Sequence, residues 1–290
     1  MGGGSWTTSS FVNYCTTTRG ISKGSLSLDG AITTSMSSQE MFKARSVDNA
    51  LKPYKVMREC LDTNEHPNTI PVILALDVTG SMGNAAVEVA KKLNVVMTNL
   101  YDKVTDVEFM VMGIGDLSYD RAPIQISQFE SDIRIAEQMD KVFFEYGGGG
   151  NLYESYTVAW YMAARHTKLD CWSRGKKGII ITMGDERINP YLPHEQLGIV
   201  TGDNVQADIE SKDLFVEASE KYDIYHLDVK HGHRWDDGID SSWMSILDTN
   251  HYKKVTLETI ANTIVDIIVT ASERANSGVA STNNNGEISW

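Results

Sequence analysis

The amino-acid sequence predicts an α/β protein: a three-layer, doubly wound, mostly parallel sheet with helices on both faces. Residues 71–76 are apolar throughout and residues 178–183 nearly so, which is typical of strands buried on both faces of a parallel sheet. Strand patterns also alternate with helical patterns along the chain, and this alternation predicts βαβ units. The right-handed crossover rule then gives a doubly wound sheet covered by helices on both faces.

The remaining elements follow from periodicity and turn composition. After the first strand, a helix is predicted because five apolar residues recur at helical spacing: Val89, Leu93, Val96, Met97 and Leu100. Later strands are expected at residues 107–114, 123–129 (a short edge strand), 178–183 and 224–229. Helices are expected at residues 133–146, 154–166 and 209–222, and a last helix with one apolar face carries Leu257, Ile260, Ala261, Ile264, Ile267 and Ile268. Turn or loop composition is expected at residues 186–206 and 231–242.

Three parts are expected along the chain: an N-terminal arm and basic segment (1–67), the α/β domain (68–271) and a polar flexible tail (272–290). The arm begins with a stretch rich in Gly, Ser and Thr. Its apolar side chains leave two interpretations open, because they either pack onto the domain or a neighbour, or are too few to offset the entropy of ordering. These side chains are Trp6, Phe11, Tyr14 and Leu26.

Composition limits the possible function classes. The chain has 290 residues, of which 41% are hydrophobic and 22% charged, as in a soluble globular protein. The net charge of −13 argues against nucleic acid as the main partner, because that binding depends on basic groups that neutralise phosphates. No apolar run is long enough to span a membrane, so no membrane partner is expected. Cys15, Cys60 and Cys171 suggest neither a disulfide framework nor a zinc motif, and no secretory signal is seen, so a reducing cytoplasm is expected.

A polar cluster with the spacing Asp-x-Thr-x-Ser ends the first buried strand: Asp77, Thr79 and Ser81. Open α/β sheets bind ligands at the carboxyl ends of their strands, which is where this cluster is expected. Carboxylate and hydroxyl oxygens, without nitrogen or sulfur, suit a hard cation such as Mg²⁺ that retains some of its water. A second interpretation is that Asp77 and Ser81 only cap the following helix.

The segment Asp77-Val-Thr79-Gly-Ser81-Met82 resembles the metal-ion-dependent adhesion site (MIDAS) of von Willebrand factor type A (vWA) domains. The order of elements is similar to that family over about residues 68–271. The resemblance implies a vWA or Rossmann-like fold and a bound Mg²⁺, Mn²⁺ or Ca²⁺. It also implies that the two hydroxyls bind the metal directly, that the Asp acts through water, and that one coordination position stays open for an acidic residue of a partner. The absent signal and unpaired cysteines favour the intracellular branch of the family, of microbial or phage type.

The family brings a second loop to the metal, which commonly supplies a Thr after glycines at a helix start. Here residues 147–150 are glycines and Asn151 stands where the Thr is expected, so Asn151 is the candidate ligand through its side-chain oxygen. Glu154 or Ser155 could also supply an oxygen. The alternative interpretation of the glycines is a flexible linker between helices.

The third loop of the family normally reads Thr-Asp-Gly, whereas this chain reads Thr182-Met-Gly-Asp185-Glu186. The resemblance makes Asp185 the candidate metal carboxylate, ahead of Glu186. The alternative is that both acids are solvated loop charges. Asp116 and Asp120 follow another predicted strand, and we expect them to cap a turn rather than extend the site.

These features favour a protein-interaction module over an enzyme. The resemblance implies metal-dependent binding of an acidic residue of a protein partner, and work as an adaptor or assembly factor beside an AAA+ ATPase. The alternative is a structural component of a phage or defence assembly that binds without metal. A Mg²⁺-dependent hydrolase is less favoured because the sequence shows no general base beside a placed nucleophile and no phosphate-binding loop. No catalytic residue is therefore assigned.

Overall fold

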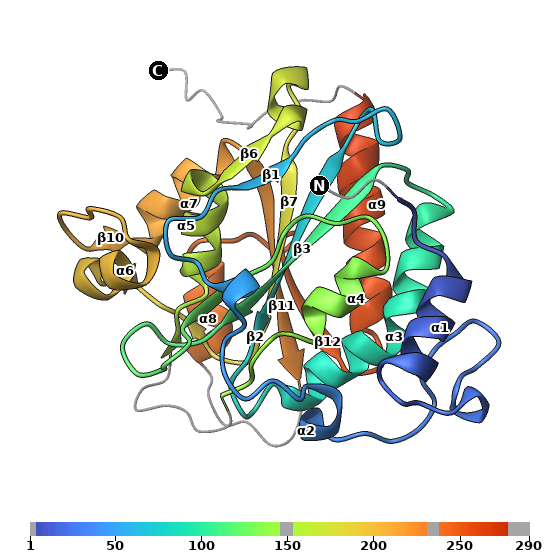
Figure 1. Ribbon diagram of the computed structural model, residues 1–290. Helices are drawn as coiled ribbons and strands as arrows, with labels where there is room; N and C mark the ends of the chain where they lie inside the picture. Colours follow the sequence, from blue (N-terminus) through green and yellow to red (C-terminus); the bar gives the residue numbers. More distant parts are fainter. Residues whose placement is uncertain (1–3, 146–152, 231–237, 278–290) are drawn as a thin grey trace.

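The structure of the protein, a computed structural model, describes residues 4–145, 153–230 and 238–277 (Figure 1). Within these residues the main sheet contains β2 (Ile70–Asp77), β3 (Val107–Ile114), β4 (Ile124–Ile126), β7 (Gly178–Gly184), β11 (Tyr222–Lys230) and β12 (Tyr252–Thr256). The strand order is β12-β11-β7-β2-β3-β4, and all neighbours are parallel except β4, which pairs antiparallel with β3. Numbered along the chain this is the doubly wound order 3-2-1-4-5-6, which reverses direction between β2 and β7. The predicted fold class is confirmed.

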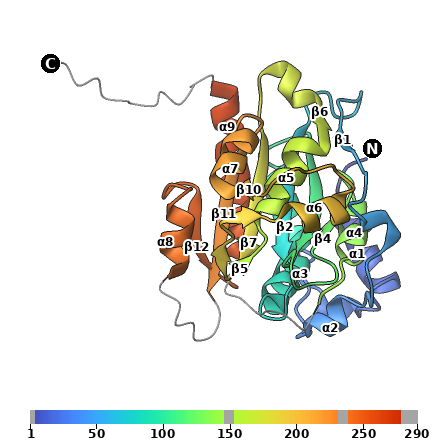
Figure 2. The same cartoon turned by 90° about the vertical axis from the view of Figure 1, so that its left-hand side faces the viewer.

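Helices cover both faces of this sheet, which runs through the middle of Figure 1. One face carries α1 (Thr8–Thr17), α2 (Ser38–Met41), α3 (Gly83–Tyr101), α4 (Arg134–Met139) and α9 (Ile260–Ser277). The other carries α5 (Thr157–Arg165), α6 (His194–Thr201), α7 (Ser211–Ser219) and α8 (Gly238–Met244), and is turned toward the viewer in Figure 2. Among the described residues, no helix is both long and apolar enough to cross a membrane.

Several short elements accompany the main sheet and its helices. Pairs of short strands are β1 (Arg58–Cys60) with β6 (Thr167–Leu169), β5 (Tyr153–Glu154) with β8 (Arg187–Ile188), and β9 (Tyr191–Leu192) with β10 (Ile209–Glu210). Short 3₁₀ helices span Lys23–Ser25, Asn49–Leu51 and Asp170–Arg174.

Strand β2 explains the unbroken apolar run in the sequence. Alternate side chains of a strand point to opposite faces of the sheet, and both faces are covered here. Val72, Leu74 and Leu76 join the core on the side of α3 and α9, while Ile73 and Ala75 join the core on the side of α5. The strand therefore has no solvent-facing side on which polar residues could alternate.

The N-terminal segment packs onto this domain and is not disordered. It forms helix α1, whose Phe11 is 0% exposed and lies in the same core as α3. Trp6 Nε1 donates a hydrogen bond to the Oδ1 of Asn94, a fully buried residue of α3 (2.8 Å). Arg19 forms a two-pronged ion pair with Asp140, directly after α4. Of the two interpretations of the arm, packing onto the domain is the one that the structure shows.

Two predicted helices are shorter than expected, because tertiary pairing competes with helical periodicity. The helix expected at 133–146 ends at Met139, and Glu145 then forms an isolated parallel bridge with Thr79. The helix expected at 154–166 begins only at Thr157, because Tyr153 and Glu154 pair with β8 as a strand. The helix expected at 209–222 is α7, Ser211–Ser219.

Two segments expected to be loops contain helices. In 186–206, Pro193 and Gly202 do not mark a turn but are the N-cap and the C-cap of α6, and Gly202 has φ of +79°. In 231–242, α8 begins at Gly238 because Ile239 and Trp243 bury one face of a helical turn, while residues 231–237 lie outside the described residues. Strand β12 was not predicted, since its lysines give an edge strand a polar sequence. Helix α9 continues to Ser277, beyond the expected domain limit at 271.

Replacing Phe11 by Ala should lower the free energy of unfolding by about 3–5 kcal/mol, because it leaves a cavity between α1 and the core. Urea denaturation followed by circular dichroism measures this change. Asn13→Ala, an exposed side chain on the same helix, is the control and should have little effect. Equal stability of the Phe11 variant and the wild type would show that α1 is not part of the folded unit.

Candidate metal centre

The candidate site lies where the direction of strand order reverses, at the carboxyl ends of β2 and β7. Asp77 is the last residue of β2, and Asp185 directly follows β7. Ser81 Oγ donates a hydrogen bond to Asp185 Oδ1 across this point (3.0 Å). Open α/β sheets bind their ligands in this crevice, so the fold brings the first and third predicted loops together.

Asp77 positions the hydroxyl of Thr79. Its side chain is 0% exposed, and its Oδ1 accepts hydrogen bonds from the Thr79 backbone N–H (2.9 Å) and from Thr79 Oγ1 (2.6 Å). Because the hydroxyl proton points to Asp77, the lone pairs of Thr79 Oγ1 remain free for a cation. Thr79 Oγ1 also lies 3.4 Å from Ser81 Oγ.

The structure does not support the interpretation that Asp77 and Ser81 cap the helix. Helix α3 begins at Gly83, its N-cap is Met82, and no side chain makes a capping hydrogen bond there. The oxygens of Asp77 are bound to Thr79 and Tyr156, and the hydroxyl of Ser81 donates to Asp185. The polar cluster is therefore bound to its own loops and not to the helix end.

Tyr156 is the site residue that sequence reasoning missed. This fully buried side chain at the N-cap of α5 donates a hydrogen bond from its hydroxyl to Asp77 Oδ2 (2.8 Å). The same hydroxyl accepts a hydrogen bond from the Glu186 backbone N–H (3.2 Å). A side chain at Gly184 would overlap the Tyr156 hydroxyl, so glycine is required there. The glycine directly after the buried run 178–183 was the available signal of a close approach.

The second loop is described only in part. Asn151 lies outside the described residues, so its place relative to the site stays a prediction. Ser155 Oγ accepts a hydrogen bond from the Leu117 backbone N–H (2.9 Å), which ties this loop to the turn after β3. Glu154 is 7% exposed, and its Oε2 has no hydrogen-bond partner among the described residues.

Asp116 and Asp120 cap the turn after β3, as expected. Asp120 Oδ2 accepts a hydrogen bond from the Asp116 backbone N–H (2.7 Å), and Asp116 Oδ1 accepts one from the Ser118 backbone N–H (2.6 Å). Glu186 contributes backbone groups: its N–H binds Tyr156 and its carbonyl accepts a hydrogen bond from Trp243 Nε1 (3.1 Å). The carboxylate of Asp185 contacts the Asp-x-Thr-x-Ser cluster at Ser81.

Negative charge accumulates at this edge of the sheet. Burial, and then the charge of Asp185, raise the pKa of Asp77 to about 7. Burial, and then the charge of Asp77, raise the pKa of Glu154 to about 10. Neither carboxyl has a Lys or Arg partner in the part of the chain that the structure describes. Buried carboxylates of this kind require a proton or a cation to balance them.

The donor set fits a hard divalent cation. The converging side chains offer carboxylate and hydroxyl oxygens from Asp77, Thr79, Ser81 and Asp185, without nitrogen or sulfur. Within the described ranges, no three His, Cys, Asp or Glu side chains form a group that could hold a metal by themselves. A cation here would thus depend on the hydroxyls and on retained water, which suits Mg²⁺ and does not suit Zn²⁺.

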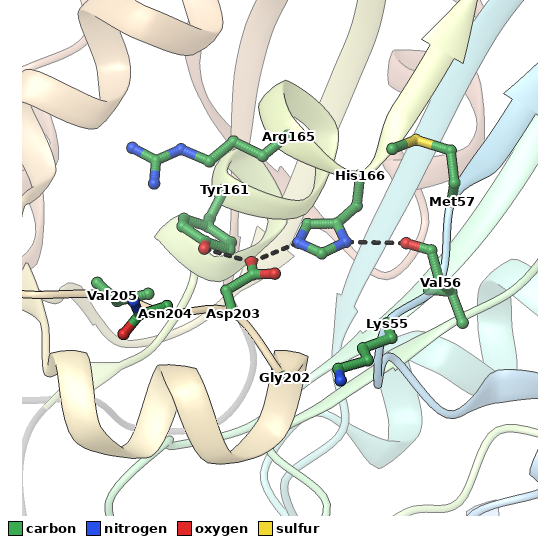
Figure 3. A pocket seen from close by; sticks show the side chains of 10 residues that line it. All are labelled: Lys55, Val56, Met57, Tyr161, Arg165, His166, Gly202, Asp203, Asn204 and Val205. Carbon is green, nitrogen blue, oxygen red and sulfur yellow. Dashed lines mark hydrogen bonds and ion pairs between the residues drawn. The ribbon is translucent and has the colours of Figure 1, made fainter.

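A separate open hollow of about 580 Å³ lies at the other end of α5 (Figure 3). Asp203 Oδ2 accepts a hydrogen bond from the Tyr161 hydroxyl (2.5 Å) and lies 2.7 Å from His166 Nε2. The described residues that line the hollow include no Ser, Thr or Cys. None of the predicted site residues is found there.

Comparison with known proteins gives no family assignment. No protein-family model matches the sequence, and no curated protein matches it either. The chain is similar in structure to the pilus adhesin SpaC from Lactobacillus rhamnosus GG, with 11% identity and a TM-score of 0.48, over 72% of this chain but only 30% of SpaC. It is also similar to the vWF domain of the pilus tip protein Mfa5 from Porphyromonas gingivalis, with 14% identity and a TM-score of 0.47, over 73% of this chain and 98% of that domain. Proximal thread matrix protein 1 from the mussel byssus is similar over 70% of this chain and 48% of its own, at 12% identity and a TM-score of 0.46. These likenesses assign neither a family nor a function to the chain.

The affinity for a divalent metal should rise with pH. Below the Asp77 pKa of about 7, a bound metal must displace a proton. As the pH rises toward 7, the Kd for Mg²⁺ should therefore fall by about tenfold per pH unit for each proton displaced. Calorimetry between about pH 5 and pH 7, in two buffers of different ionisation enthalpy, measures both the affinity and the protons released.

The metal-free protein supplies the control for that titration. The folded-state pKa of Asp77 lies above its ordinary value of 3.8, so stability from this group is fully present below about pH 4 and is lost as the pH rises toward 7. Stability in EDTA and metal affinity should therefore change in opposite directions. A metal affinity that does not depend on pH would contradict the role of Asp77.

Replacing Tyr156 by Phe should weaken metal binding by about tenfold, because residues that hydrogen-bond to the metal ligands typically contribute 10–100-fold to metal affinity. The matched control is Tyr161→Phe. It removes the hydroxyl of a second tyrosine, in α5, which donates its hydrogen bond to Asp203 instead. That variant should bind metal like the wild type. If both variants bind metal as tightly as the wild type, Tyr156 has only a structural role.

Proposed function

We propose that this protein is a metal-dependent protein-interaction module with a MIDAS-like site, in which Mg²⁺, or Mn²⁺ or Ca²⁺, receives an acidic residue of a protein partner. One observation supports this proposal above the others. The hydroxyl of Ser81 and the carboxylate of Asp185, distant in sequence, are 3.0 Å apart at the point where the sheet order reverses, beside Thr79 held by Asp77. The ligand set proposed from the first and third loops is Asp77, Thr79, Ser81 and Asp185, with Asn151 from the second loop.

Charge explains why the partner would bind through metal. The edge carries Asp77 and Asp185, and charged carboxylates there repel the acidic group of a partner. A divalent cation reverses the sign of the local field and offers a coordination position for a carboxylate oxygen. Binding would thus be lost in a chelator, and a partner without the acid would not bind.

The cellular setting is also part of the proposal. Cys15, Cys60 and Cys171 are free and buried, which fits a reducing cytoplasm. There the protein would act as an adaptor or assembly factor, with an AAA+ ATPase as the kind of partner. We propose no nucleic-acid partner, because the net charge is −13, and no membrane partner, because the sequence has no apolar run long enough to span a membrane.

Two other functions are less well supported. A structural component that binds without metal, such as one of a phage or defence assembly, would leave the buried carboxylates at the edge without a cation. A Mg²⁺-dependent hydrolase is less favoured because the sequence shows no phosphate-binding loop.

Replacing Asp77 and Ser81 together by Ala should abolish Mg²⁺ and Mn²⁺ binding, because it removes a metal hydroxyl and the acid that orients the other. Calorimetric titration of EDTA-stripped protein measures binding, and circular dichroism shows that the variant folds. If the wild type binds neither metal, the proposed function is wrong.

The open coordination position can be tested with the same protein loaded with Mn²⁺. An N-acetylated aspartyl peptide amide should displace metal-bound water and lower the paramagnetic relaxation of water protons. The matched asparaginyl peptide, which lacks the charge, should not. Equal effects of the two peptides would contradict recognition of an acidic residue.

A further inference from the structure

Glu154 belongs to the described part of the second loop and lies next to the proposed site. It lies in β5, which pairs in parallel with β8 directly after the third loop. The next two residues are fixed as well: Ser155 Oγ is bound to Leu117 N–H (2.9 Å), and the Tyr156 hydroxyl is bound to Asp77 (2.8 Å). Glu154 is thus held beside the metal loops on a rigid segment.

One oxygen of its carboxyl group, Oε2, is buried without a hydrogen-bond partner among the described residues. The side chain as a whole is 7% exposed. The charges that act on it most strongly are those of Asp77, Asp120 and Asp116, all negative. A buried carboxylate in this position is strongly unfavourable unless a cation balances it.

A proton alone does not resolve this environment. Burial and the neighbouring acids raise the pKa of Glu154 to about 10, so without metal the group holds a proton at neutral pH. However, Oε2 has no hydrogen-bond partner among the described residues, whether it carries the proton or acts as an acceptor. Buried polar atoms that stay unsatisfied in both protonation states are rare and require an explanation, such as an ion or its water.

We propose that Glu154 is the charged contribution of the second loop to the cation site, with Oε2 accepting a hydrogen bond from water bound to the cation. This inference rests on the proposed function and deepens it, because it adds a third carboxylate to Asp77 and Asp185. Contact through water agrees with the absence, among the described residues, of three acids close enough to hold a metal directly. Three carboxylates around one ion favour a divalent cation over a monovalent one, since only the former balances most of their charge.

The test replaces Glu154 by Gln, which keeps the shape of the side chain and removes its charge. We expect Mg²⁺ and Mn²⁺ to bind 10–100-fold more weakly by calorimetry, as for other residues that bind a metal through its outer shell. In EDTA the variant should unfold at the same temperature as the wild type or higher, because no cation is present there to balance the carboxylate of Glu154. With saturating Mg²⁺ the variant should unfold at a lower temperature than the wild type.

The matched control is Glu130→Gln, at an acid that is buried to a similar degree (6% exposed) but is paired with Arg134 (3.1 Å). This control should leave metal affinity unchanged and should lower stability equally with and without metal. If Glu154→Gln fails to fold, Glu154→Asp retains the charge and withdraws it by one methylene, and should also weaken metal binding.

The outcomes separate the inference from the function on which it rests. If the wild type binds no metal, both are wrong. If the wild type binds metal and the Glu154 variants bind it equally well, the inference is overturned and the proposed function stands. A loss of stability of the same size in EDTA and in Mg²⁺ would also overturn the inference, because it would show a purely structural role.

Discussion

The buried carboxyl group of Asp77 accepts hydrogen bonds from the backbone and hydroxyl of Thr79 on one oxygen, and from the hydroxyl of Tyr156 on the other. These bonds connect the end of β2, the loop that leads to α3 and the start of α5 at one point. Burial raises the pKa of Asp77, so the group is poised between a protonated and a charged state near neutral pH. The geometry of the whole edge therefore depends on how this one charge is balanced.

A cluster of buried aromatic side chains packs around Tyr156, next to Asp77. Tyr156 packs against His226 and Trp243, with ring centroids 5.3 Å away in each case, and His226 stacks on Trp243 at 3.5 Å. Burial lowers the pKa of His226 well below its ordinary value, so this ring is neutral and adds no positive charge near Asp77. Since Trp243 also binds the Glu186 carbonyl, α8 and the third loop are held together with Tyr156. The acidic edge thus rests on a rigid apolar support and gains no cation from it.

The proposed function rests on this unequal distribution of charge. The described ranges place carboxylates from three different loops at one edge, and the side chains of Asp77 and Glu154 have no basic partner there. A protein surface of this kind repels an acidic partner on its own and attracts it once a divalent ion is bound. A metal-dependent switch of binding is therefore the property that the proposed site would give the protein.

The sequence by itself determined the central strands and the motif. The apolar runs at β2, β3 and β7 are local patterns, because a strand buried on both faces cannot contain polar alternation. The spacing of Asp77, Thr79 and Ser81, and an acid after β7, could likewise be read along the chain. Only the tertiary structure decided that Ser81 meets Asp185, that Tyr156 holds Asp77, and that Oε2 of Glu154 is buried without a hydrogen-bond partner among the described residues. It also decided that Glu154 lies in a strand and not in a helix, and that α6, α8 and β12 form. The physical reason is that these features depend on contacts between residues far apart in sequence, whose side chains satisfy one another only after the sheet has brought its strand ends together.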